Sequence, residues 1–535
     1  MRARAVTAAA PAATVVIVEL VVMALLAALT MTGLAVGWPV IAAVIVVVAS
    51  AALVRFHGHT AARRALLWLR ERRSDDVASQ IPLPVDVRRG DLVVGVQRDA
   101  DTATAVIEVY GKRYEPTVTS GRRRAITRNT VPLGVIAEQL VQPGPLVVAG
   151  IDIISSGSRV GRAHGYPPVY SAVLQEQPAA GQRSTYAIVR LDIARSIQGL
   201  ALRDTVENAT AAVAERLVCA LRQQGCRAAP LASASVLDVI DELAGPVLTG
   251  RARARGRYVD NDGSYWATYR YSPEDITTDN LNDVWSWRVE AAVTTITLNR
   301  TDDNAVAVRA LVRTQTSQVP QLAPTVYLNP LPGQQIRAAL SCVPGAARLT
   351  GGGAHLLDAG ETVQIPIGPT GILVGAIDDP DQRRPVLLPL TDPEHNTRIR
   401  VCDLEPDSVY LRQLVIRAAA VGHTITIYTD RPQRWAGLVD PAIEILQSPT
   451  ATTTTPTIVV KDRADGQPRT SAPTIVSLPT DSSYPTGLKP DIEFTQLADD
   501  EVLISTTAWD TALTIASFPD ETNYLGLDDR QPIRR

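Results

Sequence analysis

The apolar and polar positions divide the chain into an almost uncharged beginning and a longer patterned remainder. From Ala8 to Met31 an apolar run contains one ionisable residue, Glu19, and a second run covers Val40 to Val54. A helix needs roughly 20 apolar residues to cross a bilayer, and the second run reaches that length if it takes in residues 35–38. The pattern predicts two membrane spans, at about residues 10–31 and 36–54.

Arginines flank these runs on both sides. Arg2 and Arg4 precede the first run, six arginines lie in the segment from Arg55 to Arg73, and the connection at Thr32–Pro39 is uncharged. A secretory signal would have one short apolar core and a cleavage site. A nucleic-acid-binding arm is a third alternative, but the formal net charge of −3 gives the whole chain no general attraction for nucleic acid.

The arginine distribution therefore predicts the cytoplasmic exit of a membrane anchor. The positive-inside rule places both termini in the cytoplasm, so that residues 1–73 form a multi-pass transmembrane hairpin in the inner (plasma) membrane. The segment Arg55–Arg73 forms a basic exit helix that contacts anionic lipid or a partner. Glu19 has three interpretations: a proton or substrate path, a helix–helix contact, or snorkelling towards one leaflet.

The remaining sequence alternates strand-like and helix-like segments and predicts a mixed α/β region. Residues 80–315 read as a first α/β domain with strands on both sides of the turn 98–101 and a helix over about 204–224. Residues 325–447 read as a second α/β domain, in which a β-α-β unit contains the segment TRIRVCDLEPDSVYLRQLVIRAAAVGHTITIYTD. Residues 448–535 read as a Thr/Pro-rich linker followed by a tail of short strands.

No catalytic, cofactor-binding or metal-binding constellation emerges from the motifs. The loop after the first strand of the β-α-β unit holds Asp403, Glu405 and Asp407, whose charges disfavour phosphate, and no phosphate-loop lysine follows. The pair Asp260 and Asp262 is compatible with a metal–diphosphate site or with a hairpin turn. The four cysteines and six histidines show no metal-ligand spacing, and TGGGAH at 350–355 reads as a turn.

The segment LRQLVIRAAAVGHTITIYTDRPQRWAGL carries a family resemblance. Together with two amino-terminal apolar runs and a basic exit, it resembles the EccE component of the mycobacterial type VII (ESX) secretion system, most closely over residues 371–438. The strand–helix–strand, the motif Thr429–Pro432 and Trp435 carry that resemblance. From the residues themselves we expect Asp430 to cap the next helix and Trp435 to pack on the sheet.

The resemblance implies a non-catalytic subunit of an inner-membrane translocation complex. EccB, EccC and EccD would be its partners in a hexameric assembly, with energy supplied by the EccC ATPase and no cofactor in this chain. The resemblance also implies a glycosyltransferase-like α/β fold, which does not by itself confer that activity. The alternative is a membrane-anchored glycosyltransferase-like enzyme of envelope biosynthesis that uses Asp260 and Asp262.

Overall fold

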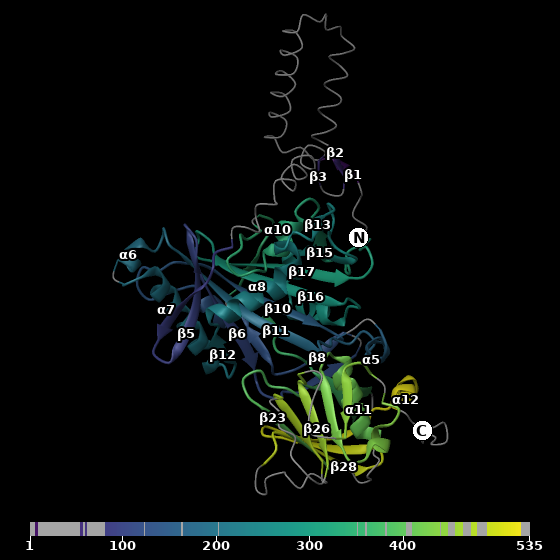
Figure 1. Cartoon of the computed structure of the whole chain (residues 1–535). Helices are drawn as coiled ribbons and strands as arrows, with labels where there is room; N and C mark the ends of the chain where they lie inside the picture. Colours follow the sequence, from purple (N-terminus) through teal and green to yellow (C-terminus); the bar gives the residue numbers. More distant parts are fainter. Residues whose placement is uncertain are drawn as a thin grey trace, which may run out of the picture.

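The computed structural model describes residues 81–525 and three short strands before them. Within 81–525 it leaves out residues 122, 162–163, 202, 350, 359–360, 380–381, 403–408, 439, 448–454, 464–471 and 479–488. The described residues form two lobes, each built on one large sheet (Figure 1).

The amino-terminal lobe contains a sheet of thirteen described strands in which every pairing is antiparallel. Its central strands follow the order β15-β17-β16-β10-β11-β6-β5. Their bounds are β15 Ser264–Tyr271, β17 Val306–Thr316, β16 Ala291–Arg300, β10 Val148–Ser158, β11 Gln182–Asp192, β6 Thr102–Gly111 and β5 Leu92–Arg98. The outer strands are β4 Val85–Arg89, β12 Arg227–Pro230, β13 Arg253–Ala254, β14 Val259–Asn261, β18 Leu328–Pro330 and β19 His355–Leu357.

Period-two alternation gives this sheet two buried faces. On β6, Ala105 and Ile107 belong to one core cluster, whereas Val106 belongs to another. The first face is covered by α7 (Val206–Gln223) and α4 (Leu133–Glu138), and the second by α8 (Ser233–Leu248) and α10 (Gln335–Leu340). The two helices α7 and α8 therefore lie on opposite faces of the sheet.

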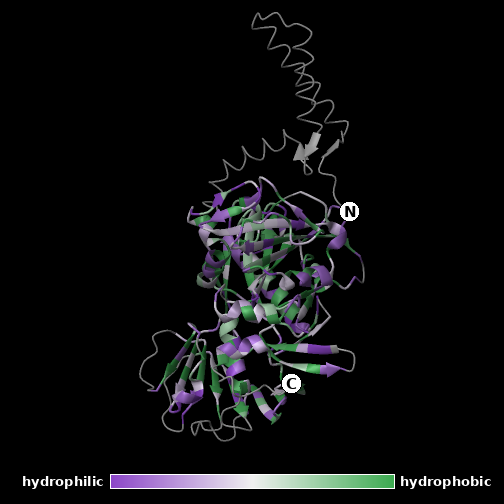
Figure 2. Cartoon of the chain, turned by 90° about the vertical axis from the view of Figure 1, so that its right-hand side faces the viewer, coloured by the Kyte–Doolittle hydropathy of each residue, from purple (hydrophilic) through white to green (hydrophobic). Residues whose placement is uncertain are grey.

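The carboxy-terminal lobe contains a mixed sheet. Five neighbouring strands in the order β25-β24-β26-β27-β23, and β28 beside them, are parallel, and β29, β30, β21, β22, β7 and β8 continue the sheet with antiparallel pairings. The parallel strands are largely hydrophobic (Figure 2), as expected for strands buried on both faces. Their bounds are β25 Ile443–Leu446, β24 Ile425–Thr429, β26 Ile458–Asp462, β27 Thr474–Ser477, β23 Thr397–Cys402 and β28 Ile492–Ala498; the others are β29 Glu501–Thr506, β30 Asp510–Thr514, β21 Ile372–Asp379, β22 Gln382–Leu388, β7 Thr117–Ser120 and β8 Arg124–Ile126.

Helices α11 (Val409–Ala420), α5 (Tyr166–Val173) and α12 (Pro519–Leu525) pack against one another in this lobe. The remaining described elements are α6 Ile197–Leu200, α9 Thr278–Asp283, the 3₁₀ turns η3 Pro273–Asp275, η4 Val284–Ser286 and η5 Pro432–Trp435, and the pair β9 Thr130–Pro132 with β20 Gln364–Pro366. Strands β7 and β8 and helix α5 come from the first half of the sequence, so the chain crosses between the lobes more than once.

Polar contacts also join the lobes. Arg227 on β12 donates to Asp392 (2.7 Å) and Glu394 (2.7 Å), which follow β22. Burial alone would raise the pKa of Asp392, but hydrogen bonding and the charge of Arg227 lower it below its usual value. Asp392, Glu394 and His395 cluster closely enough to suggest a metal site. Arg227 and Arg113 already bond to these groups, so the cluster functions as an ion-pair contact between the lobes.

The predicted fold class is wrong. The described chain is mainly β, with an entirely antiparallel first sheet, where the sequence predicted a mixed α/β region with a glycosyltransferase-like α/β fold. Some neighbours are hairpins, such as β5–β6 and β16–β17, whereas β6–β11 and β10–β16 join strands far apart in the sequence; all of these pairs are antiparallel, so the sheet lacks the parallel crossover units that were expected. The β-α-β unit is present as β23, α11 and β24, but it is one part of a larger mixed sheet.

The predicted two-helix transmembrane hairpin is likewise not found. The spans at 10–31 and 36–54 lie outside the described residues except at Val54, and no helix in the described part is both long and apolar enough to cross a membrane. Val54–Phe56 (β2) pairs with Val6–Ala8 (β1) and with His59–Thr60 (β3), so the exit segment begins with strands where a helix was predicted.

Candidate functional site

A groove crosses the α8 face of the amino-terminal sheet. Its floor consists of two cross-strand rows, because antiparallel pairing places matching positions of neighbouring strands side by side. One row is Ser184, Ser156, Val293 and Arg313; the other is Gln182, Ser158, Ala291, Gln315 and Trp266. The groove therefore spans the five adjacent strands β11, β10, β16, β17 and β15.

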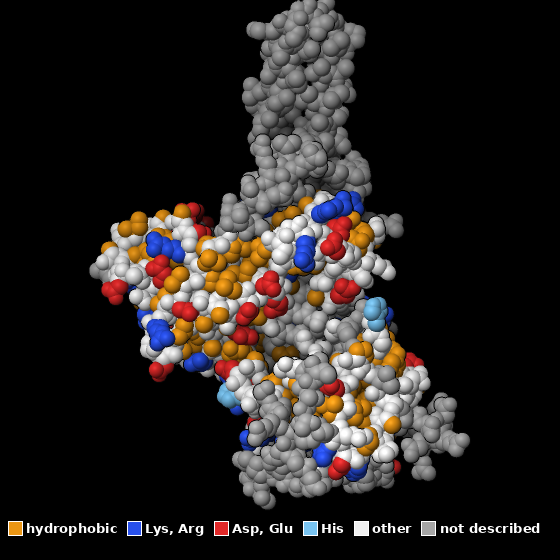
Figure 3. All heavy atoms as spheres, viewed as in Figure 1, with side chains coloured by type: hydrophobic (Ala, Val, Ile, Leu, Met, Phe, Trp, Pro, Cys, Tyr) orange, Lys and Arg blue, Asp and Glu red, His pale blue; other side chains and the backbone are white. Residues whose placement is uncertain are grey.

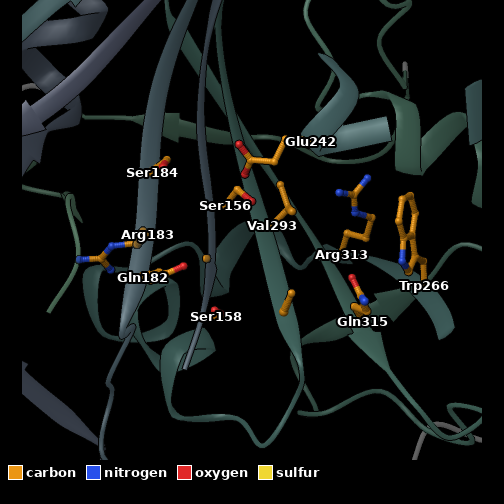
Figure 4. A pocket seen from close by; sticks show the side chains of 12 residues that line it. Ser156, Ser158, Gln182, Arg183, Ser184, Glu242, Trp266, Val293, Arg313 and Gln315 are labelled. Atoms are coloured by element: carbon orange, nitrogen blue, oxygen red, sulfur yellow. The ribbon is translucent and has the colours of Figure 1, made fainter. Parts of the chain in front are cut away.

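Small side chains create the hollow. Serine, alanine and valine occupy the central rows on β10 and β16, whereas larger side chains stand at the two ends (Figure 4). The hollow is open on one side and has a volume of about 380 Å³. Arg183 contributes only its backbone, because its side chain points to the opposite face and donates to the carbonyls of Gly368 (2.6 Å) and Ile367 (3.2 Å).

Arg313 fixes one wall of the groove. Its Nη1 donates to the carbonyl oxygens of Leu243 on α8 (2.7 Å) and Ala339 on α10 (3.1 Å), and its guanidinium lies 4.3 Å from the ring centroid of Trp266. Ala339 lies in the last turn of α10, where carbonyls are otherwise unsatisfied and a cation is favourable. One buried arginine thus links both helices at the groove, in addition to their apolar packing on the sheet.

Trp266 has an unused donor. The residue is 5% exposed, and its indole Nε1 has no hydrogen-bond partner among the described residues. Figure 4 shows the nitrogen on the side of the ring nearer to Gln315. A buried N–H without an acceptor costs about 1–3 kcal/mol, so this position favours a ligand that supplies an acceptor.

Carboxylates border the groove on the α8 side. Glu242 extends its carboxylate over the row that contains Ser156 (Figure 4), and Asp238 and Asp241 are exposed on the same helix. Figure 3 shows acidic side chains gathered over α8 on this face. Burial, followed by the charge of Glu242, raises the pKa of Glu108 on the neighbouring strand β6.

The same face contains a buried ion-pair network beyond the groove. Asp152 on β10 is fully buried and accepts from Arg190 (2.8 Å), Thr297 (2.8 Å) and Arg348 (3.1 Å). Burial would raise the pKa of Asp152, but the two arginines lower it below its usual value. Asp152 therefore stays ionised and ties three neighbouring strands together, which is a structural role.

The motif at 429–435 is held by a residue that the sequence did not single out. Asp462, fully buried at the end of β26, accepts from Thr429 Oγ1 (2.9 Å) and Trp435 Nε1 (2.8 Å) and pairs with Arg431 and Arg434. Trp435 is fully buried, as predicted. At the start of η5 the N-cap position is Arg431, whose side chain makes no capping bond, and Asp430 lies half exposed beside Arg431.

The candidate pair Asp260 and Asp262 lies in a hairpin. Asn261 pairs with Ser264, and Asp262 and Gly263 form the turn with φ of 48° and 91°. Asp260 lies 3.5 Å from Arg255, and neither aspartate lines the groove. Gly351 and Gly352 both have φ of 87° and precede β19, in keeping with the predicted turn. Glu19 and the acidic loop Asp403, Glu405 and Asp407 lie outside the described residues.

Sequence reasoning missed the groove because it missed α8. Val236, Val239, Ile240, Leu243 and Val247 have helical spacing and are buried, so the signal was present. Pro246 and Gly245 near the end of the segment obscure it, since both residues usually disfavour a helix interior. The cross-strand rows could not be found from spacing, because they depend on which strands pair.

Comparisons with known proteins bear on the same region. The family described as "Putative type VII ESX secretion system translocon, EccE" matches residues 179–271. This segment runs from the start of β11 to the end of β15 and contributes Gln182, Ser184, Glu242 and Trp266 to the groove.

Individual relatives extend the similarity beyond this segment. ESX-2 secretion system protein EccE2 of Mycobacterium tuberculosis (strain CDC 1551 / Oshkosh) is 28% identical over 424 residues, which cover 77% of this chain and 75% of the relative. ESX-5 secretion system protein EccE5 of Mycobacterium marinum (strain ATCC BAA-535 / M) is 27% identical over 357 residues, or 63% and 87% of the two chains. ESX-1 secretion system protein EccE1 of M. tuberculosis (strain CDC 1551 / Oshkosh) is 28% identical over 369 residues, or 67% and 70%.

These relatives do not support the glycosyltransferase-like alternative. The chain is a relative of the EccE components of type VII secretion systems, and the resemblance inferred from its sequence is confirmed.

Proposed function

We propose that the chain is a subunit of the inner-membrane complex of a type VII (ESX) secretion system and stabilises the translocation assembly. The observation that carries this proposal is the similarity to secretion-system proteins over 77% of the chain, with the family segment at 179–271.

The proposed role is non-catalytic. The most deeply buried carboxylates, Asp152, Asp462 and Glu521, all bond to arginines and hold elements of the fold together. A general acid or base would instead need a carboxylate that reaches a bound substrate. Glu242 reaches into the groove, and we assign it below to binding.

We further propose that the partners are the EccB, EccC and EccD components, within a hexameric assembly. The names of the relatives place those proteins in ESX secretion systems, which supports partners from the same machinery. Contact of the Arg55–Arg73 segment with anionic lipid also belongs to this proposal, since several arginines near a lipid surface attract acidic head groups.

The proposed location is the inner membrane, with both termini on the cytoplasmic side. The arginines on both sides of the uncharged segment support it, as does the pairing of Val6–Ala8 with Val54–Phe56, which brings the two ends of that segment together. Protease added to intact spheroplasts should spare the region beyond Arg73. Digestion of that region before lysis would contradict the location.

Affinity purification tests the subunit role. A tagged full-length chain, extracted from its native host in mild detergent, should elute with an ATPase and multi-span membrane proteins in one large complex. A matched strain that expresses an unrelated tagged membrane protein is the control. Recovery of the chain alone, at the mass of its own micelle, would contradict the proposal.

A further inference from the structure

The length of the groove suits an extended chain better than a compact ligand. Four steps between neighbouring strands separate β11 from β15, and at about 4.8 Å per step the groove is about 19 Å long. An extended segment rises about 3.3 Å per residue, so about six residues would fill it. Serine and glutamine side chains along the two rows can bond to the N–H and C=O groups of such a segment.

Arg313 in the groove is held by the carbonyls of Leu243 and Ala339, whereas the exposed charges along the α8 side are acidic and favour a basic occupant. Glu242, Asp238, Asp241 and Glu108 have no arginine or lysine within ion-pair distance among the residues that the structure describes. By contrast, the carboxylates that hold the fold, such as Asp152 and Asp462, all have arginine partners. Complementary charge steers association and fixes the orientation of a partner, so a cation is the matching group.

The unused indole N–H of Trp266 is an independent sign of a ligand. It lies at the β15 end of the groove, away from the β11 end formed by Gln182 and Ser184, and the residue is 5% exposed. A backbone carbonyl of an extended segment would satisfy it. Glu242 is exposed and accepts only a long bond from the Tyr186 hydroxyl (3.5 Å) among the printed contacts of the described residues, so it and the N–H together suit an occupant that carries a cation and a hydrogen-bond acceptor.

We propose that this groove binds an extended basic segment of a partner protein, with an arginine side chain of that segment on Glu242 and a backbone carbonyl on Trp266 Nε1. Arginine is preferred over lysine because its planar guanidinium can form two parallel hydrogen bonds with one carboxylate. This inference rests on the proposed function, in which the chain acts through contacts with other subunits.

A capped six-residue peptide with one central arginine among glycines is the probe. The full-length chain, labelled with 5-fluorotryptophan and held in detergent micelles, is titrated with this peptide and followed by fluorine NMR. The chain has seven tryptophans, and the signal lost in Trp266→Phe identifies Trp266. The peptide should shift the Trp266 signal. A peptide with neutral citrulline in place of arginine should bind about tenfold more weakly, since the positive charge that strengthens the hydrogen bonds to the carboxylate is lost.

Glu242→Gln should weaken binding of the arginine peptide by about tenfold. A higher salt concentration should also weaken binding of this peptide to the wild-type chain. Glu242 is exposed, so this change leaves the core intact. Glu138→Gln is the matched control, because Glu138 is exposed on α4, which packs on the opposite face of the sheet. The control should bind the peptide as the wild type does.

Three results of the titration would overturn the proposal. They are no shift of the Trp266 signal, equal affinity for the arginine and citrulline peptides, or an equal loss of affinity in Glu242→Gln and Glu138→Gln. Binding that appears only after the arginines of residues 55–73 are changed to glutamine would also overturn it, because the chain's own basic segment would then fill the groove. The titration uses the purified chain, so its failure leaves the subunit role intact. Failure of the affinity purification would instead refute the role itself.

Discussion

The carboxylate of Asp462 holds together the segment that first suggested the family. It is fully buried and accepts hydrogen bonds from the side chains of Thr429 and Trp435 while pairing with Arg431 and Arg434. The sequence drew attention to Asp430, but the carboxylate that binds these side chains is that of Asp462, on the neighbouring strand β26. A parallel pairing between β24 and β26 brings the two together, which spacing along the chain does not reveal.

Substitutions at these positions should therefore lower the free energy of unfolding by different amounts. Asp462→Ala should lower the free energy of unfolding by about 3–5 kcal/mol, because a buried arginine and an indole N–H lose their acceptor. Trp435→Ala should cost a similar amount, about 3–5 kcal/mol, through the cavity it leaves. Asp430→Ala should cost less than either, at most about 1 kcal/mol, because its side chain is half exposed and its ion pair with Arg431 lies at the surface. Urea unfolding of each variant in micelles, followed by far-UV circular dichroism, measures the three values, and equal costs for Asp430 and Asp462 would contradict this assignment.

His423 gives the fold a defined response to acid. Burial lowers its pKa from 6.5 to about 4, so the folded protein keeps this imidazole neutral at pH values where the unfolded chain protonates it. Unfolding then takes up a proton, and stability falls as the pH drops from about 6.5 to about 4. His423→Gln should flatten that part of the stability profile relative to wild type. A thermal-unfolding series over pH 4 to 8 tests this, and parallel profiles for the two proteins would contradict it.

At the scale of elements, the sequence predicted strands and helices more reliably than their assembly. The helix α7, the hairpin of β5 and β6, and the unit β23–α11–β24 lie close to where their patterns placed them. Helix α8 was missed because a glycine and a proline stand near its end. The antiparallel order of the first sheet could not be predicted, since alternation identifies a strand but not its neighbours.

Helix α12 is attached to the carboxy-terminal lobe through a buried ion pair. Glu521 bonds to Arg417 on α11 (2.8 and 2.7 Å) and accepts from Tyr166 on α5 (2.5 Å), and all three residues are at most 1% exposed. Three helices that are far apart in sequence thus meet at one carboxylate. Burial, followed by the charge of Glu521, raises the pKa of the Tyr166 hydroxyl well above its usual value, so Tyr166 remains a donor.

Glu521→Leu should therefore destabilise the lobe by about 3–5 kcal/mol, because it leaves Arg417 buried without its partner. The double variant Glu521→Leu with Arg417→Met should recover most of that loss, since apolar side chains of similar size can replace a buried ion pair. Hydrogen exchange at α12 and urea unfolding measure both changes. A double variant as unstable as the single one would show that the ion pair is not the main attachment.

At the scale of the whole molecule, the two lobes are joined by Arg227 and its acidic partners. Arg227→Ala should raise hydrogen exchange at residues 392–395 and cost about 1–2 kcal/mol, a modest value because the side chain is 24% exposed. Arg124→Ala is the control, because Arg124 and Asp279 form an exposed pair that should contribute little. Equal effects of the two substitutions would mean that the Arg227 contact does not hold the lobes.

The assembly role itself is tested most directly by the secreted proteins of a strain that lacks this chain. Deletion in the native host should abolish export of the substrates of one type VII system, and the wild-type chain supplied in trans should restore it. A vector that carries a frameshifted copy is the matched control. Unchanged export in the deletion strain, with the other complex subunits present at normal abundance, would contradict the account that this chain stabilises a secretion complex.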